Sequence, residues 1–489
     1  MQLTKEPITL GLGVEAKVGK RINFGPVGGD ETVRRAPPVD YVFDRSGSKT
    51  SLVAWDGLAA HGPYDRVSFP KKSPRLLVAY PKHLQGRVET FLSALKDGLG
   101  QKSPAFESGF PKVFGLMKLD LDLCPIELKG VDISEVERVY RDAISESLQK
   151  NTDVDAAIVV LDEPHAFLPD IQSPYLRCKA LLMTLGIPVQ SVRSTTLSQQ
   201  PYGLGYTLRN IAVSLYAKLE GTPWTVAQDR VIADELVIGI GFAELSGSRV
   251  SEKQRHVGIT TVFSGDGTYV LGNVSRECAY SEYPDVVRTS MLSVLKEVKR
   301  TNNWQPGDKI RVIFHAHRPL RRIDVASIVF ECMREVGSEQ DIELAFVTVT
   351  HDHPFFLIDK NDNGVPIKKG STIRKGVYAP KRGTIARLGR HTRLLAVNAG
   401  FLIKRPETPL PTPLLIKLHE DSTFGDVDYI AEQVLKFTSL SWRSTLPVGT
   451  PVTIFYSERI AELLGRLRGV PNWSTTALDV KLKHSRWFL

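Results

Sequence analysis

The chain has 489 residues, of which 42% are hydrophobic and 24% are charged, and its Lys and Arg outnumber its Asp and Glu by 63 to 54. This length predicts two or three domains with cores of their own, and the composition excludes fibrous and low-complexity proteins. The net charge of +9 favours a polyanionic partner. The four cysteines lack any CxxC spacing and no apolar run is long enough to span a membrane, so we expect a cytoplasmic protein without disulfides, thiolate zinc or a membrane segment.

Residues 1–75 are rich in turn motifs such as GPVGGD and RRAPPVD and show only short apolar runs, so they predict an irregular N-terminal segment. From residue 76 to about 225, apolar strand patterns alternate with helical periodicity. The predicted strands are 76–80, 156–161 and 187–192, and the predicted helices include 134–150, 175–185 and 207–219. This alternation predicts a first domain with a Rossmann-like parallel sheet covered by helices on both faces.

The pattern changes in residues 226–489, which we call the second domain. Three extended segments, 236–242, 256–264 and 268–275, predict an antiparallel meander, because GDG makes a turn between the last two. A long helix follows, and then the strand RVIFHA, a helix over about 324–336 and the strand IELAFVTVT. Three antiparallel strands followed by alternating helices and strands are the order of an RNase H-like α/β fold, although a fold does not by itself establish an activity.

Four polar residues of the first domain fall where they can meet. Tyr175 and Lys179 are four residues apart on a predicted helix and therefore project from one face. Gln190 lies at the end of the next strand, and Lys218 lies in the last turn of the next helix. Each alone has a structural explanation, since Lys218 favours the helix dipole, Tyr175 fits a core edge and Gln190 fits the surface. Together they predict a site for a small anion.

The stretches YLRCKALLMTLGIPVQSV and LRNIAVSLYAKLEGTPW resemble the MID domain of Argonaute and PIWI proteins. In that family a Tyr, Lys, Gln, Lys set binds the 5' phosphate of a guide strand, which implies that the same four residues bind such a phosphate here. Two ammonium groups and neutral donors suit a phosphate of nearly two charges. In some relatives a divalent cation joins this phosphate to the C-terminal carboxylate, so the resemblance implies a structural Mg²⁺ held by Leu489.

The resemblance begins near residue 55, at DGLAAHGPYD, and continues to the end of the chain, with no room for a PAZ domain. It therefore implies a short prokaryotic Argonaute composed of a MID domain over 76–225 and a PIWI domain over 226–489. The implied partners are a small guide, expected to be RNA, and complementary single-stranded DNA. The resemblance further implies an APAZ-containing effector protein of the sirtuin-like or TIR type, which hydrolyses NAD in abortive defence against plasmids or phage.

Active PIWI domains cut with two metal ions that carboxylates hold. The first carboxylate position falls on Gly241 in VIGIGFAE, and the second falls on Ala316 in FHAH. The last ligand position falls on Glu458 in FYSERIAELL. Glycine and alanine offer no side-chain ligand, and neither Glu277 nor Glu282 replaces both carboxylates. We therefore expect a catalytically inactive PIWI domain and no enzyme activity in this chain.

An active nuclease with a rearranged metal site is the alternative. Two HxH pairs lie on predicted strands, where residues two apart share a face and can chelate one metal. The pairs are His315 with His317 and His351 with His353, and Glu458 is the further ligand. Histidines in such pairs are more often ordinary hydrogen-bonded residues, so the structural interpretation is favoured.

A basic tract runs from Gly364 to Arg393 without any Asp or Glu. Its cations are Lys368, Lys369, Arg374, Lys375, Lys381, Arg382, Arg387, Arg390 and Arg393. Glycines between them allow backbone N–H groups to approach phosphates, so the tract predicts a channel that grips a nucleic-acid backbone without reading its sequence. A solvated loop is the alternative for single members. A protein that binds nucleic acid through this tract alone, without a guide, is the alternative for the whole chain.

Overall fold

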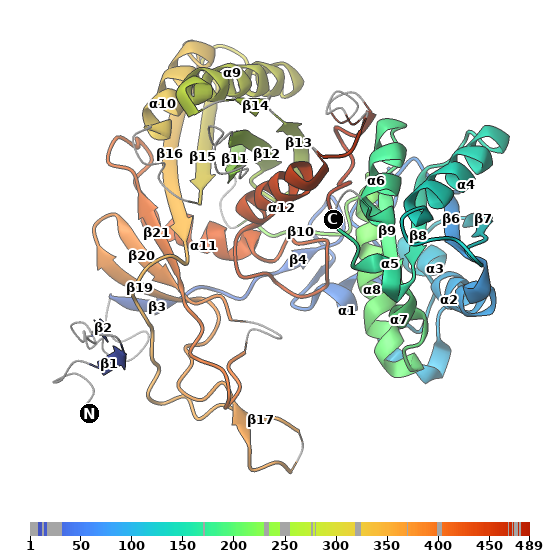
Figure 1. Cartoon of the computed structure of the whole chain (residues 1–489). Helices are drawn as coiled ribbons and strands as arrows, with labels where there is room; N and C mark the ends of the chain where they lie inside the picture. The colour runs from blue at the N-terminus through green and yellow to red at the C-terminus, as the bar shows by residue number, and fades with distance from the viewer. Residues whose placement is uncertain are drawn as a thin grey trace.

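The computed structural model shows two α/β domains that lie side by side, with the C-terminal end of the chain between them (Figure 1). The described residues are 8–11, 14–16, 32–169, 172–228, 234–244, 255–274, 277–278, 280–317, 324–368, 370–398, 403–467, 469–471, 473, 478 and 481–489. Within these ranges, no helix has both the length and the apolar character needed to cross a bilayer.

The first domain contains a parallel sheet in the order β7-β6-β8-β9. Its strands are β6 (Arg75–Pro81), β7 (Asp120–Ile126), β8 (Ala156–Leu161) and β9 (Val189–Arg193). Its helices are α2 (Gln85–Asp97), α3 (Phe110–Phe114), α4 (Val136–Lys150), α5 (Glu163–Ala166), α6 (Pro174–Thr184), α7 (Ser194–Leu197) and α8 (Pro201–Lys218). Alternate residues of β8 enter two hydrophobic clusters, one with α2 and α8 and the other with α4 and α6. This burial on both faces confirms the predicted Rossmann-like sheet.

The second domain is built on a sheet in the order β13-β12-β11-β15-β16-β21-β20-β19-β3, with β14 paired to β12. Apart from β3, its strands are β11 (Asp234–Glu244), β12 (Arg255–Ser264), β13 (Tyr269–Val274), β14 (Glu277–Cys278), β15 (Lys309–Ala316), β16 (Asp341–Thr350), β19 (Thr384–Gly389), β20 (Thr392–Leu395) and β21 (Leu414–Leu418). Strand β11 pairs antiparallel with β12 and parallel with β15, which confirms the predicted RNase H-like order.

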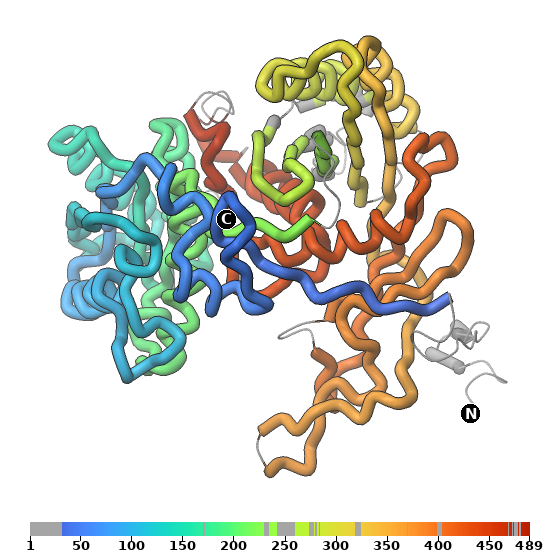
Figure 2. Tube along the Cα trace, turned by 180° about the vertical axis from the view of Figure 1, so that it is seen from behind, coloured from blue at the N-terminus to red at the C-terminus, as the bar shows by residue number. Residues whose placement is uncertain are grey.

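Four helices cover this second sheet, and they divide between its two faces (Figures 1 and 2). They are α9 (Tyr283–Thr301), α10 (Val325–Val336), α11 (Val427–Phe437) and α12 (Val452–Leu467). Helices α9 and α10 share one hydrophobic cluster with the strands, whereas α11 and α12 pack on the opposite face. Short 3₁₀ turns occupy Lys82–Leu84, Gly100–Lys102, Pro104–Phe106 and Tyr280–Glu282.

The N-terminal segment differs from the prediction of an irregular arm, because its described part from residue 32 onward joins both domains. Strand β3 (Val33–Arg35) pairs with β19, while β4 (Tyr41–Val42) pairs with β5 (Thr50–Ser51) and with β10 (Thr225–Val226). Helix α1 (Ala54–His61) follows, and β1 (Ile8–Gly11) pairs with β2 (Val14–Ala16). Figure 2 shows this blue segment passing from the second domain to the first.

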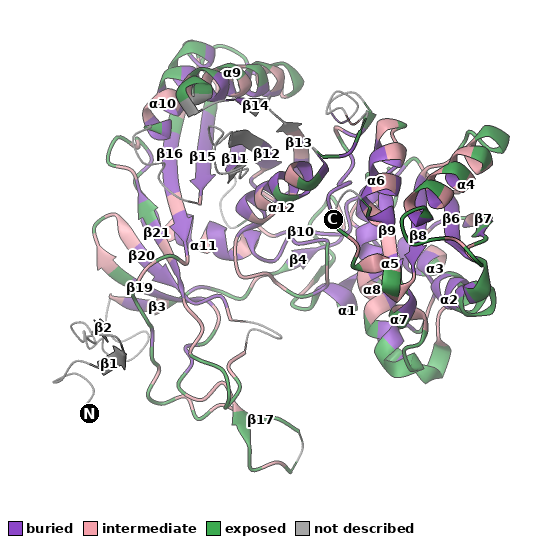
Figure 3. Cartoon of the chain, in the orientation of Figure 1, coloured by how far each residue is buried: buried purple, intermediate pink, exposed green. Residues whose placement is uncertain are grey.

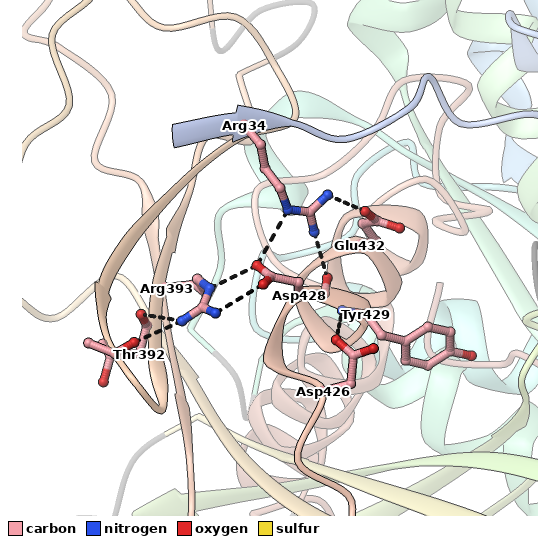
Figure 4. A network of polar contacts seen from close by, with 8 residues as sticks. Arg34, Thr392, Arg393, Asp426, Asp428, Tyr429 and Glu432 are labelled. Atoms are coloured by element: carbon pink, nitrogen blue, oxygen red, sulfur yellow. Dashed lines mark hydrogen bonds and ion pairs between the residues drawn. The ribbon is translucent and has the colours of Figure 1, made fainter. Parts of the chain in front are cut away.

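Ion pairs hold β3 and β20 against helix α11 (Figure 4). The Arg34 guanidinium contacts Glu432 and the Asp428 carboxylate, and Arg393 donates from Nε to Asp428 Oδ1 at 2.8 Å. Arg393 also donates to the backbone oxygens of Gly389 and Thr392. The two guanidinium groups lower the pKa of the Asp428 carboxyl. Ion pairs therefore hold β3 and β20 in place, and the spacing of apolar residues in the sequence does not reveal such contacts.

A long arm, residues 354–381, projects from the second domain between β16 and β19. It contains the small hairpin of β17 (Val365–Pro366) and β18 (Arg374–Lys375), which stands away from both sheets (Figure 1). Most of its described side chains are exposed or half-buried (Figure 3).

Candidate functional site

The helix α6 presents the first half of the predicted anion site. Its Lys179 side chain is only 2% exposed, although a lysine at this depth loses the hydration of its charge. The Lys179 Nζ donates to Tyr175 Oη at 3.4 Å and lies 5.6 Å from the centre of the Tyr175 ring. Four-residue spacing on one helix face therefore brings these two groups together, as predicted.

Strand β9 and helix α8 supply the second half of the site. Lys218, at the end of α8, is 1% exposed. Its Nζ donates to Gln190 Oε1 at 2.7 Å and to Ser214 Oγ at 2.9 Å. The Gln190 amide nitrogen donates to the backbone oxygen of Ser191. Ser214 lies one turn before Lys218 and was not identified from the sequence, although its position on the same helix face could have indicated it.

The electrostatics of these two halves are linked. Burial first, and then the nearby charges of Lys179 and Arg443, lower the pKa of Lys218 well below its usual value. Across the described ranges, no carboxylate forms an ion pair with Lys179 or Lys218. Two buried cations without a counter-charge are costly in the free protein. The arrangement therefore fits a bound anion that supplies the missing negative charge. We call Tyr175, Lys179, Gln190, Ser214 and Lys218 the anion pocket.

The second domain adds arginines to the rim of the anion pocket, and sequence reasoning missed them. Helix α12 packs against α6, and the Arg466 guanidinium lies 6.0 Å from the centre of the Tyr175 ring. Burial and the neighbouring charge of Arg459 lower the pKa of Arg443. Because Arg459 and Arg466 are two helical turns apart, they share a face of α12. That spacing is the signal that could have identified them.

The C-terminal tail lies against the end of helix α8 that carries Lys218. Ser485 Oγ donates to the Lys218 backbone oxygen at 2.7 Å, and the Arg486 guanidinium lies 4.8 Å from the centre of the Tyr269 ring and 4.9 Å from that of Trp442. The Leu489 N–H donates to the Arg486 oxygen. The tail that ends at Leu489 is thus held against the backbone of Lys218. The part of the chain that the structure describes contains no group of three or more His, Cys, Asp or Glu fit to hold a metal.

The first predicted carboxylate position has no room for a side chain. A Cβ on Gly241 would lie 2.4 Å from the Cβ of Ser457 in helix α12, and a Cβ on Gly239 would lie 2.1 Å from the Thr453 oxygen. Such separations are far below van der Waals contact. Helix α12 therefore lies directly against the strand that would present the first catalytic aspartate.

Ala316, at the predicted second carboxylate position, lies on a different face of the sheet from Gly241. Ala316 pairs with Ile240 and packs with it in the cluster under α9 and α10, on the face opposite to Gly241. The next residue, His317, faces α12 instead, and its Nε2 lies 3.6 Å from Glu458 Oε1. Because successive strand residues point to opposite faces, a step of one residue along the chain changes the face. His317, not Ala316, is the residue on the side of Gly241.

The histidine pairs do not assemble into one cluster. His315 is fully buried, donates or accepts at Nδ1 with Thr453 Oγ1 at 2.9 Å, and burial lowers its pKa to about 3. Both His351 nitrogens contact backbone oxygens, those of Pro413 and Gly449. His353 uses its Nε2 for Pro413 O and its Nδ1 for the Phe355 N–H. These partners agree with the structural interpretation of the histidines.

The basic tract divides into exposed and internal cations. Lys368, Arg374, Lys381, Arg387 and Arg390 are exposed and Lys375 is half-buried, while Lys369 lies outside the described residues. Arg382 differs from the prediction. Its guanidinium donates to Val397 O, Leu435 O, Thr438 Oγ1 and Ser439 Oγ, and burial lowers its pKa to about 10. Arg382 is therefore a structural residue with its donors turned inward, as is Arg393.

Comparison with known proteins agrees with this architecture. A family model described as the Piwi domain matches residues 167–468, a range that includes helices α6 and α8 of the anion pocket. The argonaute protein of Cereibacter sphaeroides is 59% identical over 487 residues, which cover 100% of this chain and 63% of that protein. The Piwi protein of Archaeoglobus fulgidus is 22% identical over 376 residues, 74% of this chain and 82% of that protein.

Solved structures show the same fold. Clostridium butyricum Argonaute, bound to a guide DNA and a 19-mer target DNA, superposes with a TM-score of 0.64 at 16% identity, covering 90% of this chain and 54% of that one. Drosophila Piwi superposes with a TM-score of 0.60 at 16% identity, covering 94% and 56%. The chain thus spans 63% of its bacterial relative and about half of these structures. The chain belongs to the Piwi-domain family, and over its length it is similar to Argonaute proteins.

Proposed function

We propose that this chain anchors the 5'-phosphorylated end of a small guide strand in the anion pocket and uses that guide to recognise complementary single-stranded DNA. The observation that carries the proposal is the burial of Lys179 and Lys218 without an acidic partner among the described residues. A terminal phosphate carries nearly two negative charges, which would neutralise both ammonium groups. The Tyr175 hydroxyl and the Gln190 amide are neutral donors for the remaining oxygens.

The pocket favours a phosphate over water for a physical reason. In a buried site, charge-assisted hydrogen bonds are stronger than in bulk solvent. An anion bound between Lys179 and Lys218 attracts both ammonium groups and offsets their mutual repulsion. Arg443, Arg459 and Arg466 extend the positive rim towards the second domain. That rim is placed to take the next phosphates of the same strand.

We propose that the Piwi domain recognises and does not cut. Support comes from Gly241, whose missing side chain could not be restored without displacing α12. His317 and Glu458 remain as a pair near that position and keep the nuclease alternative testable. The Leu489 carboxylate would hold a Mg²⁺, and the ion would supply further positive charge for the guide phosphate, since the tail is bonded to the Lys218 backbone.

The finer assignments rest on the family resemblance. They are an RNA guide, the short prokaryotic Argonaute subtype, and a cytoplasmic defence role with an APAZ-containing effector of the sirtuin-like or TIR type. The Clostridium butyricum relative was solved with guide DNA, and the A. aeolicus Argonaute was solved with externally bound siRNA. Binding of matched RNA and DNA guides, together with co-purification of the co-expressed effector, tests these assignments.

The experiment compares affinity for guides that differ only in a 5' phosphate or 5' hydroxyl. The wild-type chain is expected to prefer the phosphate, and Lys179→Ala is expected to remove most of that preference. Lys150→Ala is the matched control, because Lys150 is an exposed lysine in a helix of the same domain. Equal affinity of the wild-type chain for both guides would remove the basis of the proposal.

A further inference from the structure

We propose that the arm, residues 354–381, is a stacking platform for unpaired bases of the guide strand. This site is separate from the anion pocket and is carried by three aromatic residues, Phe355, Phe356 and Tyr378. The proposal rests on the guide binding proposed above, and it adds a contact to the bases where the pocket contacts only the terminal phosphate.

Tyr378 shows the clearest sign of a role beyond folding. Its backbone has φ of 60°, in the left-handed region that disfavours every residue with a Cβ. Its N–H donates to Asp362 O and its oxygen accepts from the Asp359 N–H, so the surrounding turn holds this conformation. The ring itself is 52% exposed. A strained residue whose ring is left in solvent is typical of a ligand contact, since glycine would suit the backbone better.

Phe356 lies on the outside of the arm. Leu357 is buried in the cluster with β19 and β20, whereas its neighbours Phe356 and Ile358 are exposed. Phe356 is 61% exposed. Phe355 stands beside His353, with ring centres 5.7 Å apart, and its N–H donates to His353 Nδ1. The His353 ring is in turn fixed on Pro413 O, so this start of the arm is anchored.

The turn brings these aromatic rings into one region. The Asp359 N–H donates to the Tyr378 oxygen, so the Tyr378 backbone lies against Asp359. Asp359 is in turn three residues from Phe356 along the chain. Three residues of extended chain span at most roughly 10 Å. The exposed Phe356 and Tyr378 therefore belong to one part of the arm, and aromatic side chains gathered in this way form platforms for the bases of a single strand.

The charge of the arm favours a nucleic acid over an apolar protein partner. The arm contains six Lys and Arg and two Asp. Both acids are engaged locally, because Asp359 Oδ1 accepts from the Asn361 N–H and Asp362 Oδ1 accepts from the Gly364 N–H. Lys360, Lys368 and Lys381 are exposed. Exposed rings between exposed cations match a strand with aromatic bases and a charged backbone.

The test uses the full chain with a 5'-phosphorylated RNA guide whose bases beyond the 5' region are either intact or abasic. The wild-type chain is expected to bind the intact guide roughly 5- to 150-fold more tightly, the range for one stacked base. Tyr378→Gly and Phe356→Leu are expected to reduce this difference, whereas Tyr378→Phe is expected to keep it. Val365→Ser is the matched control, because Val365 is an exposed aliphatic residue of the same arm.

Two further readouts separate the explanations. Tyr378→Gly is expected to leave the unfolding midpoint unchanged or higher, because it relieves the strained backbone, whereas a lower midpoint would show that the ring is structural and overturn the proposal. Every arm variant is expected to keep the preference for a 5'-phosphorylated guide. A wild-type chain without this preference would overturn the proposed function, not the stacking platform. Equal binding of intact and abasic guides, or a base requirement confined to a target overhang, would overturn the stacking platform.

Discussion

Replacing Lys218 with methionine is expected to stabilise the free protein and to weaken its binding to a 5'-phosphorylated guide. Methionine has a similar volume without the charge, and Lys218 is 1% exposed beside Lys179. Replacing a buried charge by an apolar side chain stabilises proteins by about 1–4 kcal/mol, from which the two hydrogen bonds to Gln190 and Ser214 subtract roughly 1 kcal/mol each. At the middle of these ranges, the net gain in the free energy of unfolding is about 0.5 kcal/mol. Loss of one charge-assisted bond to the phosphate would weaken binding by about 2–3 kcal/mol, or roughly 30- to 150-fold.

The lowered pKa of Lys218 makes the stability of the wild-type chain depend on pH. The folded pKa of Lys218 is lowered, so between that value and the usual value near 10.5 the unfolded chain binds more protons than the folded one. The stability of the wild type therefore rises with pH in this window. The difference in free energy of unfolding between Lys218→Met and the wild type becomes smaller as pH rises towards 10.5. Urea unfolding at several pH values measures the first effect, and titration of phosphorylated and hydroxyl guides measures the second. A destabilised variant that binds the phosphorylated guide normally would refute this reasoning.

Three other substitutions probe the remaining parts of the account. Gly241→Asp is expected to cost about 1–3 kcal/mol in urea unfolding, because its side chain would collide with Ser457, and guide-directed cleavage by this variant would contradict the steric explanation. Arg382→Ala is expected to cost about 3 kcal/mol of stability without changing the salt dependence of strand binding. Arg387→Ala is expected to leave stability unchanged and to lower the salt dependence of binding by about one phosphate contact. The reverse pattern would show that the division of the basic tract into exposed and internal cations is wrong. The folded pKa of His315 lies near 3, so the wild-type fold loses stability as pH falls from 6.5 to about 3, by about 1.4 kcal/mol per pH unit at most. His315→Asn is expected to make the free energy of unfolding less dependent on pH in this window. An unchanged acid limb in equilibrium unfolding would argue against burial of the neutral imidazole.

The sequence was most informative where burial imposes a regular pattern. The unbroken apolar run of β8 and the helical spacing of Tyr175 and Lys179 follow directly from two-sided burial and from the turn of a helix. Strand β7 was not predicted, because DLDLCPI alternates charged and apolar residues at the edge of the sheet. The short strands of the N-terminal segment were missed for a different reason, since β3 is held by pairing with β19 and by the ion pairs of Arg34.

Residue orientation was the main limit for the candidate sites. A motif places Ala316 in sequence, but only the register with β11 shows that it faces away from Gly241. Charge counting also cannot separate Arg387, which is exposed, from Arg382, whose donors turn towards helix α11 and the residues after it. Convergence of α6, β9, α8 and α12 on one anion pocket depends on tertiary packing, so the arginines of α12 became visible only in the structure.

The most direct measurement is a crystal structure of the full chain with a 5'-phosphorylated guide. The account predicts that the terminal phosphate lies within hydrogen-bond distance of both Lys179 Nζ and Lys218 Nζ, with Tyr175 and Gln190 turned to the same group. A guide whose terminal phosphate lies elsewhere, with the two lysines still in contact only with protein groups, would contradict it.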